Sequence, residues 1–274
     1  MKKIRLSVAI ATYNEEANIA RALKSVKDWV DEVIVVDGSS TDRTREIARD
    51  LGAKVYQTTN KPMFHLNKQM AIDKCRGEWI LQLDADEVVS TELKKEILSL
   101  AKPKRKKKSS VQDEPVAYWI PRKNFFLGRW LKKTGQYPDP VIRFFRQGKA
   151  WLPCQSVHEQ MEVEGKTGWL NGHLLHYPYA SFAEYLKKSN RYTSLSAQEL
   201  LEKEKKPSLW GFFKAYLRAE KDFWIRFLRC KGFLDGFPGF VFSLYSGLHQ
   251  ITTYVKFWEL YHQKRQIEIK KDWE

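Results

Sequence analysis

Cysteine is scarce in this chain of 274 residues. The three cysteines, Cys75, Cys154 and Cys230, are widely separated, and their spacing matches neither a metal site nor a disulfide framework. Such usage is typical of proteins in a reducing compartment. Residues 1–4 lead directly into a strand-like pattern and lack the apolar stretch of a signal peptide. We therefore expect a cytoplasmic protein.

Glycine-rich phosphate loops are also missing. No Gly-x-Gly-x-x-Gly motif follows the first expected strand, and no loop of the Walker type, in which a second glycine precedes Lys-Ser/Thr, occurs in the chain. These absences argue against a dinucleotide-binding fold and against a phosphate-loop ATPase. A nucleotidyltransferase is disfavoured as well, because it usually needs a glycine-rich basic loop after the first strand.

The chain has no clear membrane-spanning stretch. Residues 236–255 carry no charge and are about one membrane span in length, but they contain Pro238, His249 and Gln250. Residues 208–262 instead mix aromatic and basic side chains densely. This mixture favours helices that lie in the membrane interface. An ordinary helical cap packed on the preceding domain is the alternative.

Positive charge is in excess. Lys and Arg number 48 against 33 Asp and Glu, which gives a formal net charge of +15. This excess implies an anionic partner, which is a nucleic acid, an anionic membrane surface or a phosphorylated substrate. A basic run at residues 102–108 predicts an exposed loop within 102–115. This loop is either simply solvated or attached to lipid headgroups, with nucleic-acid binding as a third reading.

Strand and helix patterns alternate through the first 90 residues. Apolar runs predict strands at residues 4–11, 33–36, 53–57 and 79–83, and helical spacing follows Asn14 and covers 44–51 and 66–75. Asn14 is a plausible helix N-cap, as is Ser90 or Thr91 for a further helix. The alternation predicts an α/β fold with a mostly parallel, Rossmann-like sheet flanked by helices. We expect this domain to cover residues 1–180 and a helical extension to cover 181–274.

The stretch from Trp79 to Glu87 organises this domain. It predicts a buried strand that ends in Asp84 and Asp86, and side chains two apart on an extended segment point the same way. Ligands bind at the carboxyl ends of the strands in such sheets. Two carboxylates there suit Mg²⁺ or Mn²⁺, although an acidic turn without function is the simpler alternative.

Several motifs together resemble the family-2 glycosyltransferases of GT-A fold, and in particular the WaaE-like group of bacterial lipopolysaccharide-core glycosyltransferases. The matching motifs are ATYNE at 11–15, VDGSSTD at 36–42, GEWILQLDADE at 77–87, RFFR at 143–146, VHE at 157–159, KSNRYT at 188–193 and GFLDGF at 232–237. The chain departs from the usual family pattern at residues 37–40 and at Gln69.

The resemblance implies a nucleotide-sugar donor, usually UDP-linked, and a divalent cation. Asp84 would reach the ribose or metal-bound water, and Asp86 would bind Mg²⁺ or Mn²⁺. Lys68 would add positive charge near the phosphates, or is a surface lysine. The donor-binding residues implied in this way are Thr12, Tyr13, Asn14, Glu15, Asp37, Lys68, Asp84, Ala85 and Asp86.

Family-2 enzymes invert the anomeric centre, and the single displacement needs a general base. Glu159 is the candidate, with His158 as the residue that orients it. Asp139 is the rival, and a salt bridge from Glu159 to Arg143 is the structural alternative. His176 is a candidate to complete the metal site, or is a structural histidine.

Together these features predict a metal-dependent, inverting glycosyltransferase. It would act at the inner face of the cytoplasmic membrane on a lipid-linked glycan such as a lipopolysaccharide core. A polyprenyl-phosphate glycosyltransferase is the alternative, although the long β-rich middle argues against it. A basic nucleic-acid-binding module would leave the clustered acids unexplained, because carboxylates repel nucleic acid. We therefore expect no nucleic-acid partner.

Overall fold

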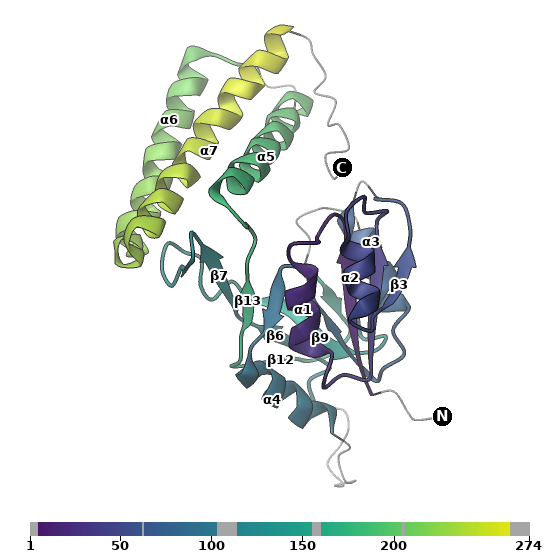
Figure 1. Ribbon diagram of the computed structural model, residues 1–274. Helices are drawn as coiled ribbons and strands as arrows, with labels where there is room; N and C mark the ends of the chain where they lie inside the picture. Colours follow the sequence, from purple (N-terminus) through teal and green to yellow (C-terminus); the bar gives the residue numbers. More distant parts are fainter. Residues whose placement is uncertain (1–4, 62, 103–113, 155–159, 204–205, 264–274) are drawn as a thin grey trace. The chain divides into compact units, whose positions relative to one another are not determined.

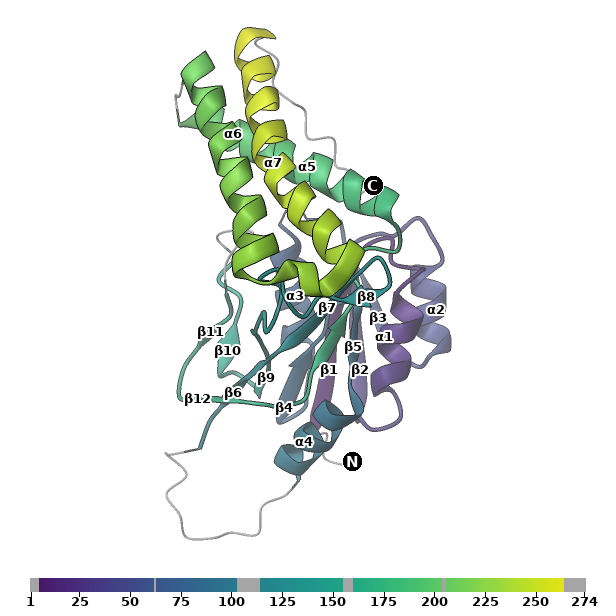
Figure 2. The same cartoon turned by 90° about the vertical axis from the view of Figure 1, so that its left-hand side faces the viewer.

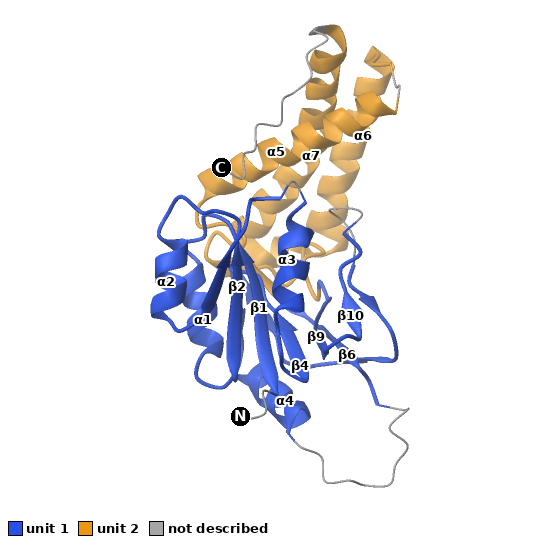
Figure 3. Cartoon of the chain, turned by 90° about the vertical axis from the view of Figure 1, so that its right-hand side faces the viewer, with its two compact units in different colours: residues 1–122, 139–176, 273–274 blue, residues 123–138, 177–272 orange. Residues whose placement is uncertain are grey.

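The computed structural model describes residues 5–61, 63–102, 114–154, 160–203 and 206–263. These residues divide into two compact units, which Figure 3 colours separately. Unit 1 holds the chain up to Arg122 and Asp139–His176, and unit 2 holds Lys123–Pro138 and the chain from Tyr177. The sequence placed the division near residue 180 and assigned 123–138 to the sheet domain. In the structure those residues cluster with the C-terminal helices.

Unit 1 is built on a sheet of seven strands. Their order across the sheet is β12 (Thr167–Trp169), β6 (Ala117–Ile120), β9 (Val141–Arg146), β4 (Trp79–Gln82), β1 (Leu6–Thr12), β2 (Glu32–Asp37) and β3 (Lys54–Gln57). The four strands from β4 to β3 are parallel, whereas β9 runs antiparallel to both of its neighbours. Strand β4 therefore lies at the centre of the sheet, as expected for its fully buried residues.

Helices cover both faces of this sheet (Figures 1 and 3). They are α1 (Ile19–Val26), α2 (Thr44–Asp50), α3 (Phe64–Asp73) and α4 (Thr91–Ala101). Side chains of β1 alternate between two cores: Val8 and Ile10 pack with residues of α1, α2 and α4, whereas Ala9 packs with residues of α3. The predicted α/β fold, a mostly parallel sheet flanked by helices, is confirmed.

Local signals at helix ends were partly right. Ser90 caps α4, because its hydroxyl accepts a hydrogen bond from the Leu93 amide at 3.2 Å. The predicted N-cap at Asn14 is wrong, since α1 begins only at Ile19. Asn14 has a φ of 52°, and its Oδ1 accepts a hydrogen bond from the Thr41 amide at 2.8 Å. The residue therefore ties two loops together instead of starting a helix.

Two short antiparallel pairs complete unit 1. Strand β5 (Glu87–Val89) pairs with β13 (Leu174–His176), which sets His176 opposite Glu87. Strand β10 (Ala150–Trp151) pairs with β11 (Glu162–Val163). The first pair matters for function, because β5 follows β4 after only four residues.

Unit 2 is mainly helical (Figure 2). Its elements are the β7 (Arg122–Phe126) and β8 (Arg129–Trp130) hairpin, α5 (Phe182–Glu202), α6 (Leu209–Trp224), the π-helix η2 (Ile225–Arg229), the 3₁₀-helix η3 (Gly232–Asp235) and α7 (Gly236–Gln263). Its core joins the hairpin to the helices through Phe126, Leu131, Tyr185 and Val241. This confirms the predicted C-terminal helical region. Among the described residues, no helix combines the length and apolar character that crossing a membrane requires.

Candidate active site

The turn between β4 and β5 carries the two predicted carboxylates. Strand β4 ends at Gln82, so Asp84 and Asp86 lie in a turn and not on an extended strand as predicted. The two side chains consequently have different partners. Asp84 Oδ1 lies 2.6 Å from Lys68 Nζ, whereas Asp86 Oδ2 lies 3.4 Å from His176 Nε2. The turn thus brings α3 and β13 to the same short segment of the chain.

Arg143 binds the residues at the start of this turn. It projects from β9, its side chain is 10% exposed, and it donates hydrogen bonds to Gln82 and to Asp84 Oδ2. Burial favours the neutral form of Asp84, but the charges of Arg143 and Lys68 outweigh it and hold the pKa of this carboxyl below its usual range. Asp84 therefore stays ionised, with each carboxylate oxygen bound to a cation.

Glu87 extends this network behind the turn. The fully buried carboxylate accepts a hydrogen bond from the Asp84 amide at 3.0 Å and lies 3.4 Å from Arg122 NH1. Arg122 in turn binds Asp139, the rival candidate for the general base, at 2.7 Å. Two arginines thus link three acids, Asp84, Glu87 and Asp139, and the positions of these acids are strongly interdependent.

The ends of β1 and β2 form a second part of the site. Thr12 lies directly opposite Asp37 in the sheet and donates a hydrogen bond to its Oδ2 at 2.9 Å. Ser40 donates to the same carboxylate from its amide at 2.9 Å and from its hydroxyl at 2.5 Å. Asp37 is fully buried. In this arrangement its carboxylate shapes the loop that follows β2.

The loop after β1 lies against the loop after β2. The Asn14 amide donates to Ser40 Oγ at 2.9 Å, and the Glu15 amide donates to Thr44 Oγ1 at 2.8 Å. Tyr13 and Glu15 are half-buried. Residues 12–15 and Asp37 are therefore brought together, as the resemblance implied, through hydrogen bonds made largely by the backbone.

Residues 7–159 match the family model described as glycosyl transferase family 2. The chain belongs to this family. This glycosyltransferase is 34% identical over 286 residues to an uncharacterized glycosyltransferase of Rickettsia typhi, with 97% of this chain and 90% of the relative covered. It is 26% identical over 273 residues to the lipopolysaccharide core biosynthesis glycosyltransferase LpsC of Rhizobium meliloti, with 97% of both chains covered.

Solved structures are similar at a lower level. The glycosyltransferase superposes on S. aureus TarS in complex with UDP-GlcNAc with a TM-score of 0.47 and 17% sequence identity, over 97% of this chain and 93% of that chain. A similarity this weak adds nothing to the family assignment. The chemistry of the site has to be argued from the residues themselves.

The residues of the glycosyltransferase that best fit a divalent cation are Asp86 and His176. Both side chains are partly accessible, at 19% and 17%, and together they offer one hard oxygen and one imidazole nitrogen. Within the described ranges, no group of three or more His, Cys, Asp or Glu side chains is placed to hold a metal ion. The pair therefore fits a cation that completes its coordination with substrate oxygens, as Mg²⁺ commonly does. Lys68 and Arg143 each bind one oxygen of Asp84, so this carboxylate is less available to a cation than that of Asp86.

The other predicted site residues lie either outside the described ranges or within the turn itself. His158 and Glu159 lie outside the residues that the structure describes, so the proposed base stays a prediction. Ala85 is buried in the turn. The structure also explains Gln69, where the family pattern differs, because its side chain accepts a hydrogen bond from the Leu152 amide at 2.8 Å and donates to Asp73 at 2.7 Å.

The sequence missed several residues that complete the site. Arg143, Gln82, Glu87 and Arg122 form the network that holds Asp84. Gln82 could have been recognised from the sequence, since it is the one polar residue in the apolar run from 79 to 83. A buried polar side chain in a central strand needs a partner, and here that partner is Arg143.

Proposed function

We propose that this glycosyltransferase moves a sugar from a UDP-linked donor to a hydroxyl group of a lipid-linked glycan, with inversion and with Mg²⁺ or Mn²⁺. The observation that carries the proposal is the turn between β4 and β5. It presents the Asp86–His176 pair next to a carboxylate that is bound to Lys68. A cation-binding pair beside a lysine suits a diphosphate, whose oxygens bind both.

Each group then has a defined task. A bound cation would neutralise the charge that develops on the leaving diphosphate. Asp86 and His176 would hold that cation, and Lys68, kept in place by Asp84, would add positive charge beside the same diphosphate. Residues 12–15 and Ala85 would surround the nucleoside and the sugar phosphate, and the buried Asp37 would position the loops through Thr12 and Ser40. These groups bind and orient the donor before the reaction.

The displacement itself needs a base on the acceptor side. The acceptor oxygen forms a bond to the anomeric carbon, and the bond from that carbon to the diphosphate oxygen breaks. The proton of the acceptor hydroxyl passes to the carboxylate of Glu159, which His158 orients. Relatedness to LpsC, named for lipopolysaccharide core biosynthesis, supports a glycan of that kind as the acceptor.

Calorimetric titration tests the donor site. We expect UDP to bind in the presence of Mn²⁺ and to bind at least about tenfold more weakly after chelation, because the cation joins the carboxylate to the diphosphate. The UDP-sugars that bind are then tested for release of UDP in the presence of a lipopolysaccharide-core acceptor. If UDP, GDP and dTDP all fail to bind with and without Mn²⁺, the proposal is wrong.

We also propose that unit 2 attaches the protein peripherally to an anionic membrane surface, at the inner face of the cytoplasmic membrane. Helices α6 and α7 pack through small residues: Ala215 and Ala219 are the buried residues of α6, and a Cβ on Gly247 would lie 2.6 Å from the Ala219 carbonyl oxygen. Large apolar side chains therefore face outward, which is the pattern of helix pairs in lipid.

The outward apolar side chains form two stripes at helical spacing. On α7 they are Phe237, Phe240, Leu244, Leu248, Val255 and Trp258, and on α6 and η2 they are Trp210, Phe213, Leu217, Trp224 and Leu228. Exposed basic residues accompany them at Lys214, Arg218, Lys221, Arg229 and Lys231. Apolar stripes with a basic flank complement an anionic lipid surface.

Replacing Phe237 and Leu244 with serine should release the protein from vesicles of phosphatidylglycerol and phosphatidylcholine. Inserting each side chain into lipid contributes about 1.5–3 kcal/mol, so we expect a loss of at least about tenfold in the partition coefficient, measured by co-sedimentation. Trp169→Ser is the matched control, since Trp169 is 61% exposed and belongs to unit 1. Equal sedimentation of all three proteins would exclude the two stripes as the attachment surface.

A further inference from the structure

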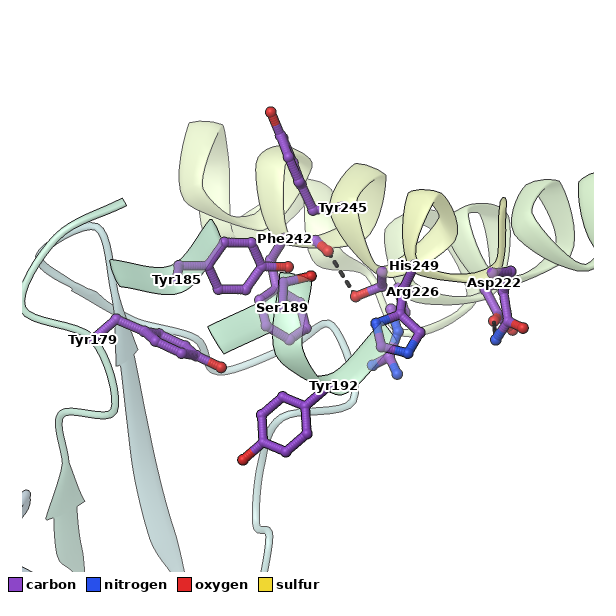
Figure 4. Close-up of a pocket in the computed structure, with 11 residues that line it drawn as sticks. Tyr179, Tyr185, Ser189, Tyr192, Asp222, Arg226, Phe242, Tyr245 and His249 are labelled. Carbon is purple, nitrogen blue, oxygen red and sulfur yellow. Dashed lines mark hydrogen bonds between the residues drawn. The ribbon is translucent and has the colours of Figure 1, made fainter. Parts of the chain in front are cut away.

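Unit 2 contains an open pocket of about 250 Å³ lined by residues of α5, α6, η2 and α7, which we call the cavity (Figure 4). The space is several times the volume of a water molecule, which occupies about 30 Å³ in the liquid. Its lining combines aromatic rings with polar groups, among them Tyr185, Ser189, Arg226 and His249. None of these residues belongs to the carboxylate cluster of unit 1. The cavity is therefore a separate candidate for a ligand site.

Arg226 supplies the positive charge of this cavity. It lies on the π-helix η2, an irregularity that is frequent at functional sites. Its NH1 group donates to the Thr134 carbonyl oxygen at 3.0 Å, and its guanidinium lies 5.7 Å from the centre of the Phe242 ring. Among the described residues, no carboxylate forms an ion pair with it. A positive charge in a cavity without a counter-ion attracts an anionic ligand.

Asp222 also lines the cavity and has to be weighed against this charge. Its Oδ2 accepts a hydrogen bond from Gln250 Nε2 at 3.0 Å, and it makes no ion pair with Arg226 within the described part of the chain. In Figure 4 the Asp222 side chain lies on the far side of His249 from Tyr185 and Ser189. Gln250 therefore binds one oxygen of the Asp222 carboxylate, and Arg226 remains the charged donor that lines the cavity.

Three neutral donors accompany Arg226. In the part of the chain that the structure describes, the side chains of Tyr185, Ser189 and His249 have no hydrogen-bond partner, and all three line the cavity. The Tyr185 hydroxyl is directed toward Ser189 in Figure 4. Burial raises the pKa of Tyr185 to about 12, so this hydroxyl keeps its proton and can donate. Polar groups in such surroundings favour a ligand that accepts several hydrogen bonds.

We propose that this cavity binds the phosphate group of a phosphate ester. Arg226 matches the geometry and charge of phosphate oxygens, and the hydroxyls of Tyr185 and Ser189 and the imidazole N–H of His249 donate to the remaining lone pairs. The volume leaves room for the group that is esterified to the phosphate. Two sources share this chemistry, a phospholipid headgroup and a soluble sugar phosphate. The inference does not depend on the donor chemistry proposed for unit 1.

Calorimetry on the full chain tests the site with three probes: inorganic phosphate, glucose 1-phosphate, and dihexanoyl-phosphatidylglycerol below its micelle concentration. We expect Arg226→Gln to weaken binding at least about tenfold, because a charged hydrogen bond contributes about 1.5–3 kcal/mol. Tyr185→Phe, which removes a hydroxyl without a partner in the described chain, should weaken it by about threefold or more while the protein stays folded. Lys187→Gln is the matched control, since Lys187 lies on α5 with Tyr185 and Ser189 but is exposed and does not line the cavity.

The outcomes separate the two sources. Binding of the lipid alone assigns the site to a headgroup, and binding of glucose 1-phosphate with equal or higher affinity assigns it to a soluble ester. Circular dichroism establishes whether each variant is folded. If Arg226→Gln does not fold, Tyr185→Phe still tests the proposal. The proposal is overturned if no probe binds to the wild type, or if Tyr185→Phe and Lys187→Gln bind the probes equally well.

Discussion

Asp86→Ala should abolish the Mn²⁺-dependent part of UDP binding and lower kcat/KM by about 10²–10³-fold, similar to the loss of one preorganised charge-stabilising group. Asp86 and His176 are the two side chains of the described chain that best fit a shared cation, with 3.4 Å between Oδ2 and Nε2. Without the carboxylate, a single imidazole would remain to hold the metal. Calorimetric titration of UDP with Mn²⁺ and with chelator measures the first effect, and initial rates measure the second.

The control for this experiment is Glu78→Ala. Glu78 immediately precedes β4, at the opposite end of the strand from Asp86, and its side chain is 45% exposed. The Glu78→Ala variant should bind UDP as the wild type does. His176→Ala should also weaken Mn²⁺-dependent binding, by about 10–100-fold if it is a metal ligand. Metal-dependent UDP binding that survives Asp86→Ala would show that this pair does not hold the cation.

Arg143→Ala should destabilise the protein by about 3–5 kcal/mol, the usual cost of breaking a buried ion pair from one side. Arg143 is 10% exposed and is bound to Gln82, Asp84 and Glu87. Glu87 is fully buried, and without Arg143 its remaining ion pair among the described residues is with Arg122, at 3.4 Å. Urea unfolding measures the loss in the free energy of unfolding.

The matched control is Arg146→Ala on the same strand. Arg146 is 34% exposed and pairs with Glu78 at 2.9 Å on the surface. Surface pairs contribute about 0–1 kcal/mol, so the loss should be several-fold smaller than for Arg143→Ala. Equal losses for the two variants would mean that the buried network of Arg143 contributes no more to the free energy of unfolding than the surface ion pair of Arg146.

The same network predicts how stability depends on pH. The charges of Arg143 and Lys68 hold the pKa of Asp84 below its value in the unfolded chain, which is about 3.9. The stability from this shift is fully present above that value and is lost as the pH falls through the lower pKa of the folded protein. In Arg143→Ala the shift is smaller. The difference in unfolding free energy between wild type and variant should therefore shrink below about pH 4, because protonation of Asp84 costs the wild type an interaction with Arg143 that the variant lacks.

Local signals predicted much of unit 1. The alternation of apolar runs located the four parallel strands β1 to β4, and Ser90 marked the start of α4, because both features depend on residues close in sequence. The start of α1 was misplaced, since Asn14 is also a good loop residue and tertiary contact with Thr41 decided its role. The turn at Asp84 was likewise missed, because the hydrogen bond between Glu87 and the Asp84 amide closes it.

The sequence by itself determined the α/β class, the position of Asp84 and Asp86 after the central strand, and the glycosyltransferase family, because these rest on local pattern and motif. Only the tertiary structure decided which charges meet. Arg143 reaches Gln82 across 61 residues of chain, and Arg226 reaches Thr134 across 92. Such contacts depend on strand order and helix packing, which leave no periodic trace along the chain. Tertiary packing likewise decides that residues 123–138 belong to the unit of the C-terminal helices. In the sequence, these residues lie between segments of the sheet unit.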